Sequence, residues 1–290
     1  MSSRPPTLLP APVWRRLAND HADRTRLLVG DHITRRSRGQ KHPVWDFLFD
    51  YYMVSPAKLA NWHPGVDRGL EGEPPHKKWK GYTTVTVDGT PAVAVDRDGE
   101  RRRHGSELAA IGRLLAATVD NPAHFNCFGL HEWAMVYRQK THRHPLPLRL
   151  GQEGTDAVVD SHDLKCTHID AYRFFTPPAK PLNLHVITRD SQPEFEQCGC
   201  LHATMDLFKW AKKMGPLVDG ELLLDCFELA KDARVLDMEA SPYDCRELGF
   251  GVVAVETAEG KRQYVNRQRE LAQRAAPLRS RLLGIVEAVM

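Results

Sequence analysis

The segment Cys198-Gly-Cys-Leu-His-Ala-Thr-Met-Asp-Leu-Phe-Lys-Trp-Ala-Lys-Lys-Met214 indicates a helix that packs in the protein core. Its apolar residues recur at helical spacing in two rows: Leu201, Met205 and Phe208, and Ala203, Leu207, Trp210 and Met214. Pro193 before the segment and Gly215-Pro216 after it predict a helix over 194–214. The remaining row carries His202 and Asp206 and then two lysines. We therefore expect the first turn to face a pocket and the last turn to face water.

Other segments of the chain show the same helical spacing of apolar residues, which predicts a mainly α fold: a single helical domain with a small β-hairpin. Helix-length amphipathic segments cover 13–38, 101–120, 125–138 and 217–239, and another runs from residue 260 to the C-terminus. Residues 82–96 alternate at period two around Asp88-Gly89, which predicts a β-hairpin. We expect a flexible arm over residues 1–12, a single helical domain over 13–290 with this small hairpin insertion, and an irregular, functional loop region over 139–190.

Composition limits the classes of protein that fit this chain. It has 290 residues, of which 42% are hydrophobic and 27% charged, as in ordinary globular proteins. No apolar run approaches the roughly 20 residues that a membrane span requires, and no secretory signal is recognisable, so we expect a cytoplasmic protein. The formal charge of +3 is compatible with DNA as a partner without arguing for it.

Two short segments carry the chemistry that the sequence offers. Cys166-Thr-His168-Ile-Asp170 lies upstream, and Cys198, Cys200, His202 and Asp206 follow within nine residues of one another. We predict that the two segments meet in the fold. Thiols and imidazoles bind zinc, and imidazoles with carboxylates bind zinc or iron, so a metal site of His168, His202, Cys166, Cys198 and Cys200 is one interpretation. The spacing Cys-x-Cys differs from the Cys-x2-Cys of structural zinc modules.

Metal-free acid–base catalysis is the alternative interpretation of the same residues. It needs a positioned carboxylate or imidazole, and the candidates are His131, Glu132, His168, Asp170, His202 and Asp206. Aromatic and cationic residues nearby would suit stacking on a planar ring, and we predict substrate contacts from Trp133, Tyr172, Arg173, Phe174 and Phe175. The acid–base candidates could instead be hydrogen-bonded polar residues of a core.

Four segments together resemble an actinobacterial family whose members are commonly named 3-methyladenine DNA glycosylase. They are His42–Tyr52 (HPVWDFLFDYY), Trp62–Gly65 (WHPG), Gly199–Asp206 (GCLHATMD) and Leu236–Asp244 (LDMEASPYD). The resemblance covers nearly the whole chain, and it implies an N-glycosidic hydrolase that releases a damaged purine from DNA. In such an enzyme, Asp170 or Asp206 would activate water or stabilise the cationic sugar.

Three hypotheses follow from the sequence. The first is the DNA glycosylase-like hydrolase, with a base flipped into an aromatic pocket. The second is a metal-dependent oxidoreductase that acts on a small molecule and uses His131, His168, Asp170 and His202 to bind zinc or iron. The third is a non-enzymatic binding protein.

Overall fold

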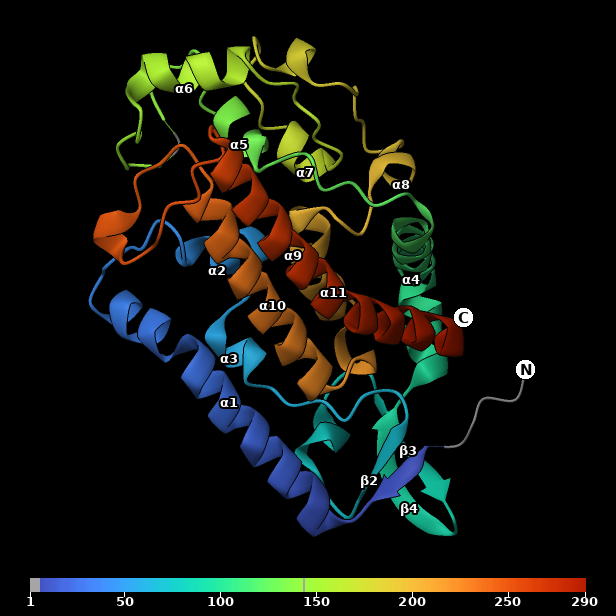
Figure 1. The fold of residues 1–290 in the computed structure, drawn as a ribbon. Helices are drawn as coiled ribbons and strands as arrows, with labels where there is room; N and C mark the ends of the chain where they lie inside the picture. The colour runs from blue at the N-terminus through green and yellow to red at the C-terminus, as the bar shows by residue number, and fades with distance from the viewer. Residues whose placement is uncertain (1–5, 143) are drawn as a thin grey trace. The chain divides into compact units, whose positions relative to one another are not determined.

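The computed structural model describes residues 6–142 and 144–290 and has a mainly helical fold with one small sheet (Figure 1). Its contacts divide the chain into two compact units. Unit 1 comprises residues 1–113, 208–228 and 278–290, and unit 2 comprises residues 114–207 and 229–277. Helices α4 (Arg97–Asp120), α9 (Leu201–Met214), α10 (Gly220–Glu239) and α11 (Ala258–Val289) contribute residues to both units. The single domain over 13–290 stays a prediction.

Unit 1 contains the sheet and the first three helices. The strands are β1 (Thr7–Leu9), β2 (Arg68–Glu71), β3 (Tyr82–Val87) and β4 (Thr90–Val95), in the order β1-β2-β4-β3. The predicted hairpin is confirmed as β3 and β4, joined by Asp88 and Gly89 at φ 47° and 78°, the positive angles that a tight two-residue turn demands. The hairpin is extended by β2, and β1 pairs with β2 in parallel.

Helix α1 (Ala11–Ser37) follows β1 directly, and the short helices α2 (Asp46–Tyr52) and α3 (Pro56–Leu59) come next. Ser55 caps α3 as the sequence indicates, because its hydroxyl accepts a hydrogen bond from the amide of Lys58. Helix α3 lies against α1, and the start of α1 lies beside β2 (Figure 1). Trp14, Trp62 and Leu70 form a buried cluster at this point. Of the predicted flexible arm, residues 1–5 lie outside the described residues and Thr7–Leu9 is strand β1.

Unit 2 contains the helices α5 (Leu130–Ala134), α6 (Gly151–Asp160), α7 (Ile169–Tyr172) and α8 (Gln192–Phe195), together with its shares of α4, α9, α10 and α11. The region 139–190 is thus less irregular than predicted, because α6 and α7 lie inside it. The predicted helix over 125–138 is wrong in its length: Phe128, Gly129 and Arg138 adopt left-handed angles, which end a helix on either side of α5. The helix predicted over 194–214 begins at Leu201.

Short 3-10 helices complete the described chain: Pro75–Lys78, Lys180–Leu182, Gly215–Leu217 and Arg246–Leu248. Within the described residues, no helix has the length and apolar character needed to cross a bilayer.

A testable consequence concerns Gly65 in unit 1. Its φ is 84°, and a Cβ there would lie 3.0 Å from the Cβ of Asp219, whereas Gly39 has a similar φ of 68° with open space around it. We expect Gly65→Ala to lower the free energy of unfolding by about 2–3 kcal/mol, because it adds a clash to the backbone strain. Gly39→Ala should cost about 1 kcal/mol, because only the strain is present. Urea titrations of both variants measure the difference, and equal losses would show that the close approach to Asp219 is unimportant.

Candidate functional site

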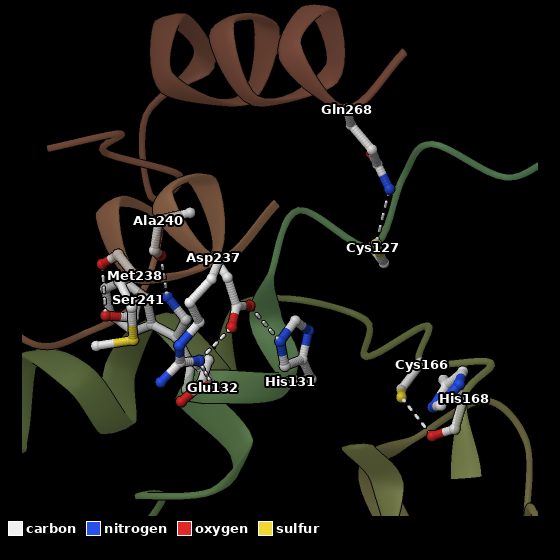
Figure 2. A network of polar contacts seen from close by, with 12 residues as sticks. Cys127, His131, Glu132, Cys166, His168, Asp237, Met238, Ala240, Ser241 and Gln268 are labelled. Atoms are coloured by element: carbon white, nitrogen blue, oxygen red, sulfur yellow. Dashed lines mark hydrogen bonds and ion pairs between the residues drawn. The ribbon is translucent and has the colours of Figure 1, made fainter. Parts of the chain in front are cut away.

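A buried pair of His131 and Asp237 forms the centre of the candidate site in unit 2. His131 Nε2 lies 2.8 Å from Asp237 Oδ1, and both side chains are nearly inaccessible (Figure 2). His131 belongs to α5, which Gly129 starts with a φ of 70°, and Asp237 belongs to the last turn of α10. Trp133 holds α5 against α10 by donating its indole hydrogen to the carbonyl of Ala240 at 2.9 Å.

Arg234 connects this pair to Glu132. It lies one turn before Asp237 on α10, and its Nη1 is 2.5 Å from Asp237 Oδ2 and 3.4 Å from Glu132 Oε1. Arg234 and Asp237 are both 1% exposed, and Glu132 is 6% exposed. Charges at this depth carry a large desolvation cost, which their mutual contacts must offset.

The pKa values of His131 and Asp237 are shifted in opposite directions. Burial lowers the pKa of His131, but the charge and hydrogen bond of Asp237 outweigh it and hold that pKa above its ordinary value. Burial raises the pKa of Asp237, and the neighbouring His131 and Arg234 outweigh this in turn and hold it well below its ordinary value. The pair therefore prefers an ionised Asp237 with a protonated His131.

His202 is the next residue of the site, on the first turn of α9. Its ring lies edge-to-face with that of His131 at a centroid distance of 4.5 Å, and it stacks on His168 at 5.3 Å. Burial, followed by the charge of His131, lowers the pKa of His202 to about 3, so its imidazole is neutral near pH 7. His202 is nevertheless half-buried, whereas His131 and His168 are buried. It is thus the accessible member of the three imidazoles.

His168 adds two more carboxylates. Its Nε2 lies 3.4 Å from Glu196 Oε2 and 3.5 Å from Asp206 Oδ2, and all three side chains are at most 2% exposed. His168 directly precedes α7, Glu196 follows α8, and Asp206 lies one turn after His202 on α9. The segments that contain Cys166–Asp170 and Cys198–Asp206 therefore do meet in the fold, as the sequence analysis predicted.

The remaining predicted residues lie in different surroundings. Asp170 is bound by Arg189 at 2.7 Å and Arg173 at 3.3 Å, so it faces two guanidinium groups. Trp133, Tyr172 and Phe175 are buried in unit 2, and protein covers their rings. Phe174 is half-buried, and the guanidinium carbon of Arg173 lies 4.5 Å from its ring centroid. Among the four predicted aromatic residues, Phe174 therefore offers the accessible ring.

The thiols are set apart from the imidazoles. Cys166 Sγ donates to the carbonyl of His168 at 3.5 Å (Figure 2), and burial raises its pKa to about 12. Burial likewise raises the pKa of Cys200, and Cys198 is half-buried. In the part of the chain that the structure describes, neither Cys166 nor Cys200 belongs to a group of donor atoms close enough to share a metal ion.

Among the described residues, one group of three places its donor atoms close enough to share a metal ion. It consists of His131, Glu132 and Asp237, with one donor atom of each within 4.8 Å of the others. His131 and Glu132 were predicted as catalytic residues, and His131 also as part of a metal-dependent oxidoreductase, whereas the metal site predicted from the Cys/His segments contributes no member of the group. The structure thus moves the candidate metal site from the Cys/His segments to α5 and α10.

Sequence reasoning missed Arg234, Asp237 and Glu196. A signal was present for the first two, because they fall among the buried positions of α10, beside Ala233, Leu236 and Met238, where charges are rare. Glu196 follows a four-residue helix and carries no periodic signal. Comparisons of the chain with protein-family models, with curated proteins and with solved structures found no match.

The lowered pKa of His202 predicts a pH dependence of stability. The pKa of His202 falls from 6.5 in the unfolded chain to about 3 in the folded chain. Between these two pH values the unfolded chain binds a proton at His202 and the folded chain does not, so acidification lowers the free energy of unfolding. The groups around it are His131, His168, Asp206 and Asp237. His202→Gln should reduce the slope of stability against pH by up to about 1.4 kcal/mol per pH unit in this window.

Urea titrations at pH 7.0, 6.0 and 5.0 measure the slope. His124→Gln, at an exposed position of the same unit, is the matched control and should retain the wild-type slope. An unchanged slope in His202→Gln would mean that the pKa of His202 is the same in the folded and unfolded chains.

Proposed function

We propose that this chain is a metal-dependent oxidoreductase whose centre is formed by His131, Glu132 and Asp237, with His202 beside it. The observation that carries the proposal is the convergence of donor atoms of His131, Glu132 and Asp237 within 4.8 Å of one another. Iron and zinc both accept imidazoles and carboxylates as ligands, and a second imidazole is close by, because the ring of His202 lies beside that of His131.

Arg234 suits this proposal as an orienting group. It binds Asp237 Oδ2 and Glu132 Oε1, whereas His131 faces the other oxygen of Asp237, Oδ1. A separation of 2.8 Å between Nε2 and Oδ1 fits a hydrogen bond, and it also fits two neighbouring ligands of one ion. Residues that fix the ligating carboxylates in this way sustain metal affinity in known sites.

A proton and a metal ion compete for His131 in this proposal. The raised pKa of His131 keeps a proton on the imidazole in the metal-free protein, and a ligating imidazole must be neutral. Metal binding should therefore release a proton and weaken at acidic pH. The bound ion would supply a site for an oxidant and a small-molecule substrate, and half-buried His202 marks the side that such molecules can reach.

Metal analysis tests the proposal. Protein made without a polyhistidine tag, purified without chelators and reconstituted with Fe(II) or Zn(II) should carry about one equivalent by elemental analysis. Asp237→Asn and His131→Asn should each retain less than about a tenth of that, because a ligand is lost. Near-UV circular dichroism checks that both variants are folded.

His32→Gln is the matched control for the metal analysis. His32 is likewise a buried histidine beside a carboxylate, with its Nδ1 3.1 Å from Asp46 Oδ1, but it lies in unit 1. It should retain the full metal content. Wild-type protein that holds less than about 0.1 equivalent after reconstitution would refute a protein-bound metal.

A DNA glycosylase-like hydrolase is the second candidate function. The family resemblance implies it, and the pairing of His168 with Asp206 favours it, because an imidazole beside a carboxylate suits general acid–base catalysis. DNA is the partner in this candidate, DNA repair is its role, and the cytoplasm is the expected location of either activity.

Base release from alkylated duplex DNA tests the second candidate. The wild-type protein should release the damaged purine in the presence of a chelator, and Asp206→Asn should reduce the rate at least about 100-fold. His124→Gln again serves as the control. No release above background from the wild type would end this assignment and leave the metal analysis unaffected.

A further inference from the structure

A large cavity lies in unit 1, independent of the site proposed above. Its volume is about 780 Å³, and its walls come from α1, from α2 and from the segment that leads into α3. This volume is within the range of cavities that bind small molecules. Helix α1 supplies one continuous face, with residues 22, 25, 29, 32 and 36 at alternating steps of three and four and residues 26 and 33 beside them.

Apolar residues of α1 and of the segments opposite it together make up most of the lining surface. Val29 and Ile33 of α1 face Phe49 and Val54 across the cavity, and Ala22, Ala57 and Ala60 line its other end. Ile33 is 45% exposed although it is a large apolar residue. From residue 22 to residue 36, α1 rises by about 21 Å, so the cavity is elongated. An elongated apolar cavity fits a chain-like apolar ligand better than a compact one.

The polar groups gather on α1. Thr25 is 2% exposed, and its hydroxyl oxygen has no hydrogen-bond partner among the described residues. His32 stacks on Phe49 at a centroid distance of 3.6 Å, and burial lowers its pKa despite the neighbouring Asp46, so its ring is neutral near pH 7.

Charge distinguishes the two ends. Arg36 lines the end near His32, and no carboxylate of the described residues forms an ion pair with it. Arg26 also lines the cavity and pairs with exposed Asp23 at 2.8 Å, and Asp50 is the single carboxylate of the lining. The lining therefore has an excess of one positive charge, and Arg36 is its available cation.

We propose that this cavity binds a long-chain fatty acid, with its acyl chain along the apolar residues of the lining and its carboxylate at Arg36. The elongated apolar walls account for the chain, since each buried methylene adds to the affinity. The guanidinium of Arg36 accounts for the head group, because it binds carboxylates in a bidentate manner.

Fluorescence titration with cis-parinaric acid, below its micellar concentration, tests the proposal on the full chain. We expect saturable binding at one molecule per chain and displacement by palmitate. Val29→Trp fills the cavity and should weaken binding at least about 10-fold. Ile33→Glu adds a carboxylate at a half-exposed position and should do the same without disturbing the core.

The Arg36→Ala variant distinguishes the contribution of the carboxylate to affinity from that of the acyl chain. It should weaken palmitate at least about 5-fold and leave displacement by hexadecanol unchanged, because the alcohol has no charge to lose. Arg16→Ala, at an exposed α1 position outside the cavity, is the control.

Three results would overturn the proposal: no saturable binding, equal binding by Val29→Trp and Ile33→Glu, or a wild-type dimer that Ile33→Glu converts to monomer. The last would mean that a second copy of the chain covers the cavity. A failure of metal binding would not bear on any of these outcomes.

Discussion

The buried ion pair between His131 and Asp237 is the interaction on which the arrangement of unit 2 depends. It joins a five-residue helix to the last turn of α10, and Arg234 extends it to Glu132. A helix as short as α5 does not persist by its own propensity, so its position must come from such contacts. Burial removes these charges from water. The loss of one partner would therefore leave the other as an unpaired buried charge, which strongly destabilises the fold. The same contacts hold the donor atoms of His131, Glu132 and Asp237 close enough together to share a metal ion.

Acid–base chemistry and metal binding are two uses of one electrostatic arrangement. His131 and His202 are neighbours with opposite pKa shifts. Asp237 stabilises a charge on His131 and outweighs its burial, whereas burial, followed by the charge of His131, lowers the pKa of His202. A neutral imidazole beside a paired one is a proton acceptor beside a proton donor. If a cation replaces the proton of His131, that imidazole becomes a ligand, so the metal-free and metal-bound forms differ by a proton exchange at one ring.

The sequence predicted the regular parts of this fold because their signals are local. Asp88-Gly89 defines the hairpin turn, and Ser55-Pro56 marks the start of α3. Helix α5 was predicted too long, because the left-handed angles of Phe128 and Arg138 come from tertiary contacts and not from glycine. The meeting of His168 with Asp206 was predicted from residue types, whereas Asp237 lay outside any motif of paired ligands. Partners 106 residues apart, such as His131 and Asp237, are joined by packing that no local pattern encodes.

The parallel pairing of β1 with β2 has a consequence for the integrity of unit 1. Strand β2 is bonded to β4 on one side and, through Thr7–Leu9, to β1 on the other. Proteolytic removal of the first nine residues would leave that second side of β2 with open amides and carbonyls. Exposed strand edges recruit strands from other chains. The three residues of β1 thus cover one edge of β2. Protein trimmed at its N-terminus would be prone to aggregate by strand pairing at that edge.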